Sequence, residues 1–164
     1  LKVVKSSPGG REQVLRFLGP GETFNEIGAF ASRPNPATAI ALEPAGVWLL
    51  QRAAIARLAR EQPDFAQRII EIMADRVIDL VSLVADLSLR SVTGRLARLV
   101  LEEAEGDVHQ RPRWRTQAEL AARLGTVPDV VQRALRGLEN EGAIEIQPRE
   151  IRIRDRDALI RLAS

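Results

Sequence analysis

The 164-residue sequence contains no cysteine, one histidine and one methionine. Without thiols, these residues cannot form disulfides, thiolate zinc sites, iron–sulfur clusters or a cysteine nucleophile. One histidine cannot build the usual ligand cluster of a catalytic metal site, and no nucleophile–base pair is evident. An enzyme is therefore the least favoured functional class.

Long apolar runs are also missing. No uninterrupted stretch approaches the ~20 apolar residues that span a bilayer, and no charged-then-apolar leader opens the chain. With 45% hydrophobic residues, the chain can bury a core as one large or two small domains. We expect a soluble, cytoplasmic protein with no membrane partner. Because it opens on LKVVKSS without an initiator methionine, we also expect a fragment.

Basic residues are unevenly distributed along the chain. Residues 1–110 hold 13 basic and 14 acidic side chains, whereas residues 111–164 hold 11 and 8. Residues 111–136 contain Arg111, Arg113, Arg115, Arg123, Arg133 and Arg136 against only Glu119 and Asp129. This bias suits contact with a phosphate backbone. A general preference for arginine is the alternative, since Lys2 and Lys5 are the only lysines.

The first 50 residues predict short strands between frequent glycine and proline breaks. Turns are expected at SSPGGRE and at GPGE, and apolar clusters such as Val47–Leu50 predict strands. Strands interrupted this often favour a barrel or jelly roll. The segment from Phe24 to Leu42 is expected to be a loop-rich insert. A short helix and a break at Pro63 should follow.

The stretch from Gln62 to Leu89 predicts one long helix with two apolar stripes. The first has the heptad spacing of a helix that packs along a partner helix, and it comprises Ala66, Ile70, Met73, Val77, Leu80, Val84 and Leu87. The second comprises Phe65, Ile69, Ile72 and Leu83. We expect one stripe to pair with a second copy and the other to face the chain's own first domain. A core helix of a monomeric bundle would show the same periodicity.

The long helix should be followed by another helix, which Ser91 should cap. Two further helices are expected after that one. In TQAELAARLGTVPDVVQRALRGLENEG, Thr116 and Glu119 form a capping-box pattern, and Gly125 permits a sharp turn into a second helix. Pro128 falls in the first turn of that helix, where no backbone donor is needed. This is helix-turn-helix spacing. The polar segment EGDVHQRPR before it is expected to be a linker.

The residues after Gly142 alternate in a pattern that predicts a β-hairpin wing, with a turn at Gln147–Arg149. A helix-turn-helix with a wing and an arginine-rich flank predicts binding to double-stranded DNA. The second helix would enter a major groove, with base edges met by Asp129, Gln132 and Arg133. Phosphates would be held by Thr116, Gln117, Arg123 and Arg136. A helical hairpin inside an enzyme would use the same packing chemistry.

The whole chain resembles the CRP/FNR family of bacterial transcription regulators. The resemblance rests on GETFNEIGAF, on QPDF at the start of the long helix, on SVTGRLA and on ELAARLGTVPDVVQRALRGLENEGAI. It implies an α+β fold with a partial cyclic-nucleotide-binding-like β-roll (jelly roll) over 1–61, a dimerisation helix over 62–90 and a winged helix-turn-helix over 91–164. It also implies a homodimer, RNA polymerase as a partner and about 50 missing residues before Leu1.

The effector loop departs from the family pattern. Members that bind cyclic AMP hold the ribose with a Gly-Glu pair and the cyclic phosphate with Arg-Ser or Arg-Thr. Here Asn25 precedes Glu26, and Pro36 and Ala37 replace the Arg pair. A buried phosphate without a guanidinium partner is costly. The pocket implied by the resemblance comprises Glu26, Ile27, Pro36, Ala37, Thr38, Leu80 and Val81, the last two replacing hydroxyl side chains that face the base. We therefore predict an unknown small effector other than cyclic AMP.

The PNPATA run at Pro34–Ala39 is similar to family branches that sense redox state or nitric oxide, some through haem. No cofactor is evident in the sequence. His109, in the expected linker, and Met73, in the heptad stripe, are its only candidates for axial haem ligands, and both fit other roles better. Haem would require a contribution from residues before Leu1.

The sequence thus predicts a sequence-specific DNA-binding regulator that acts as a homodimer on pseudo-palindromic sites. Pro128 and Asp129 replace a common Arg-Glu pair of the family, so we expect its half-site to differ. The main alternative is a dimeric DNA-binding architectural protein that needs no effector, and a cyclic-nucleotide-responsive regulator is less favoured.

Overall fold

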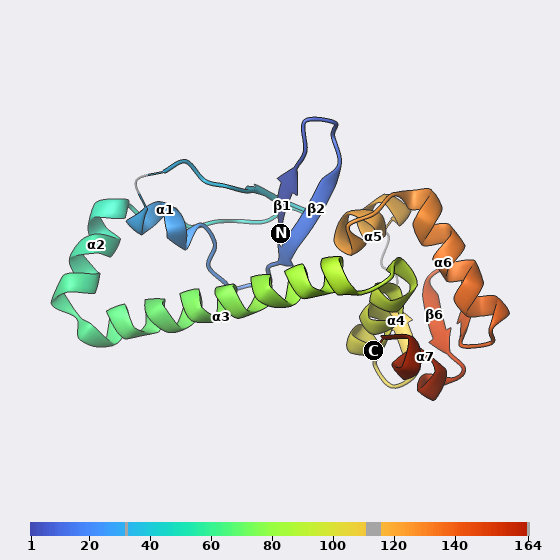
Figure 1. The fold of residues 1–164 in the computed structure, drawn as a ribbon. Coiled ribbons are helices and arrows are strands. Elements are labelled where there is room, and N and C mark those ends of the chain that lie inside the picture. The colour runs from blue at the N-terminus through green and yellow to red at the C-terminus, as the bar shows by residue number, and fades with distance from the viewer. Residues whose placement is uncertain (32, 111–115, 164) are drawn as a thin grey trace. The chain divides into compact units, whose positions relative to one another are not determined.

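The computed structural model describes residues 1–31, 33–110 and 116–163. They form two units, Leu1–Gly10 with Val14–Leu83 and Arg11–Gln13 with Val84–Ser164. The elements of each unit are labelled in Figure 1. None of the described helices is long and apolar enough to cross a membrane.

The first unit contains a three-stranded sheet in the order β2-β1-β3. Strands β1 (Lys2–Ser6) and β2 (Glu12–Phe17) are joined by the predicted turn, in which the amide of Gly10 donates to the carbonyl of Ser7 at 3.0 Å. Strand β3 (Thr38–Ile40) pairs antiparallel with β1, with Val4 opposite Thr38. The segment predicted as a loop-rich insert contains β3 and the short helix α1 (Glu26–Phe30).

Two helices complete this unit. Helix α2 (Arg52–Glu61) ends one residue before Gln62, whose extended backbone (φ −128°, ψ 98°) is the conformation favoured before proline. Pro63 then begins the long helix α3 (Pro63–Leu89), so the predicted break and the predicted helix are both confirmed.

The predicted strand over Val47–Leu50 is wrong for this structure. The segment forms no strand, and Trp48 and Leu49 expose 95% and 93% of their surface. A strand needs a hydrogen-bonded neighbour, and the described residues supply none here.

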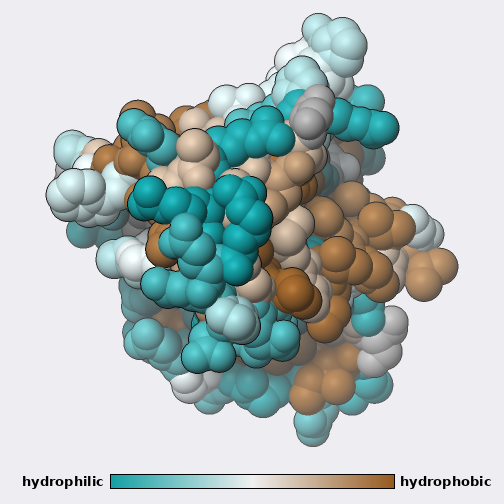
Figure 2. Space-filling view, turned by 90° about the vertical axis from the view of Figure 1, so that its left-hand side faces the viewer, coloured by the Kyte–Doolittle hydropathy of each residue, from teal (hydrophilic) through white to brown (hydrophobic). Residues whose placement is uncertain are grey.

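Figure 2 shows hydrophobic surface on one face of the molecule, beside a hydrophilic area. The first unit buries few apolar side chains, among them Val4, Val14 and Leu18.

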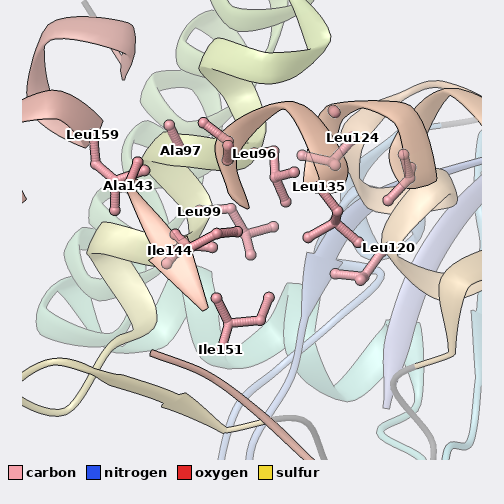
Figure 3. Packing of buried hydrophobic residues seen from close by; sticks show 14 of the residues in the cluster. Leu96, Ala97, Leu99, Leu120, Leu124, Leu135, Ala143, Ile144, Ile151 and Leu159 are labelled. Atoms are coloured by element: carbon pink, nitrogen blue, oxygen red, sulfur yellow. The ribbon is translucent and has the colours of Figure 1, made fainter. Parts of the chain in front are cut away.

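The second unit has its own hydrophobic core (Figure 3). Ser91 caps helix α4 (Val92–Glu103), since its hydroxyl accepts from the amide of Gly94 at 3.0 Å, as predicted. Helices α5 (Gln117–Leu124) and α6 (Pro128–Asn140) form the predicted helix-turn-helix, with Gly125 left-handed at φ 65°. The core side chains include Leu96, Leu99, Val100, Leu120, Ala121, Leu124, Val131, Ala134, Leu135, Leu138, Ile144, Ile151 and Leu159.

The predicted wing is confirmed and is larger than expected. Strands β5 (Ile144–Ile146) and β6 (Glu150–Ile153) pair antiparallel, and β4 (Val108–Gln110) adds to β6 with His109 opposite Ile151. The linker predicted over this region is therefore partly a strand. His109 is fully buried, because its strand alternates one side chain into the core.

A final helix, α7 (Arg156–Ala163), was not predicted from the sequence. Asp155 caps it, since its carboxylate accepts from the amide of Ala158 at 2.9 Å, and Leu159 is fully buried. An aspartate followed by Leu159 and Leu162 is a helix-start pattern that could have revealed it.

Candidate functional site

The outer face of α6 carries the side chains predicted to read bases. Its inner face is fixed in the core by Val131, Ala134, Leu135 and Leu138. Asp129, Arg133 and Arg136 are therefore exposed, and Gln132 is half-buried. Neither Arg133 nor Arg136 has an ion-pair partner among the described residues. This helix consequently presents two un-neutralised guanidinium groups one turn apart.

The start of α5 carries two residues predicted to hold phosphates. The hydroxyl of Thr116 accepts from the amide of Glu119 at 3.2 Å, which is one half of the predicted capping box. Thr116 and Gln117 are both exposed at this end of the helix. Helix N-termini attract anions because their first amides have no intrahelical partner. The position thus suits a phosphate, and the phosphate contact itself stays a prediction.

Arg123, another predicted phosphate contact, lies in a different environment. Its guanidinium forms an ion pair with Glu103 of α4, and both side chains are only 24% exposed. His109 Nδ1 lies 3.7 Å from the other oxygen of Glu103. These contacts join α5, α4 and β4 inside the unit, so Arg123 has an internal partner, whereas Arg133 and Arg136 have none in the described part of that unit.

The wing arginines divide into paired and unpaired side chains. Arg154 donates to Glu145 and lowers the pKa of that carboxyl. Arg152 lies 2.6 Å from Glu150, a hydrogen bond that raises the pKa of the arginine. Arg149, in the turn, is exposed and has no ion-pair partner in the described ranges. Sequence reasoning missed it, although a basic residue in a wing turn was a usable signal.

Arg111, Arg113 and Arg115 were part of the predicted basic flank. They lie outside the described residues.

The effector loop is tied to α3 by a contact that the sequence did not reveal. The carboxylate of Glu26 accepts from the hydroxyl of Thr23, and Arg76 Nη2 lies 3.4 Å from the same oxygen. Arg76 Nη2 also donates to the carbonyl of Thr23 at 3.2 Å. Asn25 is left-handed at φ 67°, a conformation that asparagine tolerates better than most residues other than glycine. The backbone at Asn25 therefore fits the glycine of the family pattern.

The remaining residues predicted for the effector pocket are more open. Ile27, Pro36 and Thr38 are exposed, and Ala37 is half-buried. Lys5 donates to the carbonyl of Pro36 at 2.6 Å. On α3, Leu80 and Val81 expose 46% and 64% of their surface. No group of three or more His, Asp or Glu side chains in the described part of the chain could hold a metal ion.

The two haem-ligand candidates lie in different surroundings. His109 is completely buried in the second unit beside Glu103, so it cannot reach an iron without unfolding that region. Met73 is partly buried on α3. The expectation that His109 lies in a linker is also wrong, because β4 carries it into the core.

The two stripes of α3 differ in exposure. The residues of the second stripe, Phe65, Ile69, Ile72 and Leu83, are all partly buried. In the heptad stripe Ala66 and Met73 are partly buried, whereas Ile70, Val77, Leu80, Val84 and Leu87 are exposed. Most of the heptad stripe thus keeps a third or more of its apolar surface exposed in the described chain.

Comparison with known proteins identifies both parts of the chain. Residues 1–62 match the family described as Cyclic nucleotide-binding domain, and residues 94–162 match the Crp-like helix-turn-helix domain. The CRP-like cAMP-activated global transcriptional regulator of Mycobacterium tuberculosis is 26% identical over 99% of this chain and 75% of its own length. The transcriptional regulator flp of Lacticaseibacillus casei is 30% identical over 93% of this chain and 70% of its own.

Solved structures show the same fold. A CRP/FNR-family transcriptional regulator from Eubacterium rectale superposes with a TM-score of 0.79 at 24% identity, over 99% of this chain and 76% of that one. The predicted fold class, a β-roll sensor, a long helix and a winged helix-turn-helix, is confirmed. The chain belongs to the CRP/FNR family, whose members are DNA-binding transcription regulators rather than enzymes.

Proposed function

We propose that this regulator is a homodimer that reads pseudo-palindromic DNA under the control of an effector other than cyclic AMP. The observation that carries DNA reading is the outer face of α6, where Arg133 and Arg136 are exposed and form no ion pair with the residues that the structure describes. The planar fork of Arg133 would pair with two acceptors of a guanine, and Arg136 would hold a phosphate. Asp129 and Gln132 would contact neighbouring base edges.

The heptad stripe of α3 supports the homodimer. Ile70, Val77 and Val84 expose 60%, 60% and 61% of their surface, although each lies at a position where a coiled coil buries apolar side chains. Pairing of two such helices would remove this surface from water. Two reading helices would then meet half-sites about one helical turn, or roughly 34 Å, apart.

The effector loop supports an effector other than cyclic AMP. The Mycobacterium tuberculosis relative is named as cAMP-activated, but this chain has Pro36 and Ala37 where the resemblance places the phosphate-binding pair. Leu80 and Val81 offer no hydroxyl to a base. The carboxylate of Glu26 already accepts from Thr23 and lies beside Arg76. An apolar effector that touches Leu80 and Val81 fits these side chains better than a cyclic nucleotide.

Selection of bound DNA from a random pool at controlled salt tests this proposal. A homodimer that reads base edges should enrich symmetrical sites, and its affinity for them should exceed that for scrambled DNA by about 10³ or more. Binding that falls with salt but enriches no sequence would leave phosphate attraction alone and would overturn specific reading.

The departures in the effector loop also favour a second candidate, an architectural DNA-binding dimer that needs no effector. DNA affinity that is unchanged by cell extract and by oxidation state would support it. RNA polymerase stays a predicted partner of the regulator. A purified transcription reaction, run with and without the regulator, would reveal activation or repression.

A further inference from the structure

The last turn of α3 is surrounded by arginine side chains. Asp86 Oδ1 lies 2.8 Å from Arg98 Nη1 and also accepts from the guanidinium of Arg90. Arg98 in turn lies 2.6 Å from Glu102, and this hydrogen bond raises the pKa of the arginine above its ordinary value. Asp86 is 22% exposed, so solvent screens these pairs only in part. We call Asp86, Arg90, Arg95 and Arg98 the Asp86 cluster.

Arg95 connects this turn to the helix-turn-helix. Its Nη1 donates to the carbonyls of Arg90 and Asp86 at 2.7 and 3.3 Å, and its Nε donates to the carbonyl of Leu124 at 2.9 Å. Leu124 is the last residue of α5, immediately before the turn into α6. Arg95 therefore ties the end of α3 to the element that places the reading helix.

Arg90 adds a link to the C-terminal helix, because its Nε donates to the carbonyl of Ala163 at 2.9 Å. All of these residues belong to the second unit, which includes α3 from Val84 onward. Carbonyls at a helix C-terminus carry partial negative charge, and guanidinium groups satisfy them. Asp86 is the carboxylate that Arg90 and Arg98 share. Without it, two positive charges would face each other at the junction of α3 and α4.

We infer that Asp86 is a positioning residue for DNA recognition, which fixes the last turn of α3 against α4 and α5. In a homodimer joined through α3, this junction would connect each α6, through α4 and α5, to the paired helices. The inference rests on the proposed homodimer and adds a residue outside the sets proposed to contact DNA and effector. Replacing Asp86 should weaken simultaneous reading of two half-sites, while each reading helix keeps its own contacts.

The test compares DNA binding by purified full-length wild-type protein, Asp86→Asn, Asp86→Glu and the control Asp79→Asn. Asp79 lies in the same helix, is exposed and has no ion-pair partner among the described residues, so its replacement removes the same charge. The readout is the ratio of affinities for a selected palindrome and for a single half-site. This ratio reports simultaneous engagement. Removal of an acidic charge alone should slightly raise both affinities, because DNA is anionic.

For Asp86→Asn the ratio should fall by roughly tenfold, within the usual range of coupling between sites, with half-site affinity preserved or slightly raised. Asp86→Glu should restore most of the ratio, and Asp79→Asn should leave it unchanged. If Asp86→Asn does not fold, Arg98→Gln, which removes one partner of Asp86, should lower the ratio in the same direction. A normal ratio in folded Asp86→Asn would overturn the inference. A wild-type protein that is monomeric or does not prefer the palindrome would instead overturn the proposed function.

Discussion

Arg76 Nη2 of α3 lies 3.4 Å from Oε1 of Glu26 in α1, and the two side chains are only 26% and 17% exposed. They are 50 residues apart in the sequence, and both contact Thr23. The carboxylate that would hold a ribose is therefore already engaged by the long helix. The same contact ties the effector loop to the helix that carries the heptad stripe.

Cyclic AMP should not bind this protein tightly. Glu26, which would hold the ribose, is already engaged by Arg76, and no arginine stands at Pro36 to pair with the cyclic phosphate. Desolvating the phosphate without a guanidinium partner is costly. Isothermal titration of full-length protein should show no saturable heat at micromolar concentrations. The cAMP-activated Mycobacterium tuberculosis relative serves as the positive control. Stoichiometric binding of cyclic AMP to the present protein would contradict the proposal that its effector is another molecule.

Leu80→Asp should convert the dimer to a monomer. Leu80 lies in the middle of the exposed apolar stripe, and a carboxylate there would be buried against a second copy without a partner. Light scattering at micromolar concentration measures the change in mass. Ser82→Asp adds the same charge at an exposed position of the same helix and should stay dimeric. A dimeric Leu80→Asp protein would show that the heptad stripe is not the interface.

Arg133→Ala and Arg136→Ala should affect DNA binding differently. Arg133→Ala removes a bidentate contact, so it should weaken the free energy of DNA binding by about 1–3 kcal/mol and relax specificity at one guanine. Arg136→Ala should weaken all sequences alike and reduce the slope of log K against log salt by about one. Affinity for the selected site and for its single-base variants, at several salt concentrations, separates the two. Equal loss on every sequence for Arg133→Ala would remove it from the base-reading set.

Arg149→Ala should lower the salt dependence of DNA binding. Arg149 is exposed in the wing turn without an ion-pair partner in the described ranges, whereas Arg152 lies 2.6 Å from Glu150. Replacing Arg149 should therefore reduce the slope by about one, as loss of one phosphate contact does. Arg152→Ala is the matched control and should have a smaller effect, because Glu150 already neutralises its charge. Equal slopes for the two variants would show that the wing turn does not contact phosphate.

The sequence predicted the elements that local rules determine. Ser91 and Thr116 cap their helices, Gly125 turns left-handed, and the alternation after Gly142 forms a hairpin. These features depend on residues within a few positions of one another, so spacing reveals them. The strand predicted at Val47–Leu50 failed because a strand also requires a neighbour that spacing cannot supply.

The candidate site was predictable only in part, for a related reason. Arg133 and Arg136 could be placed on the outer face of α6, because helical periodicity separates that face from the buried one. The partners of Arg76 and Arg123 could not be predicted, since Glu26 and Glu103 reach them only through tertiary packing. Sequence spacing therefore predicts which face of a helix is exposed more readily than it predicts ion pairs between residues far apart in the sequence.

Gly94→Ala and Gly137→Ala should change stability in opposite directions. A Cβ at Gly94, in the first turn of α4, would lie 2.7 Å from the carbonyl oxygen of Leu162, so α7 would have to move. Such overpacking lowers the free energy of unfolding by about 1–3 kcal/mol. At Gly137, inside α6, a Cβ would meet nothing within 4 Å, and alanine should stabilise the helix by about 0.5–1 kcal/mol. Urea unfolding of both full-length variants, monitored by circular dichroism, gives the two free energies. A Gly94→Ala protein as stable as wild type would show that α7 does not pack closely on the start of α4.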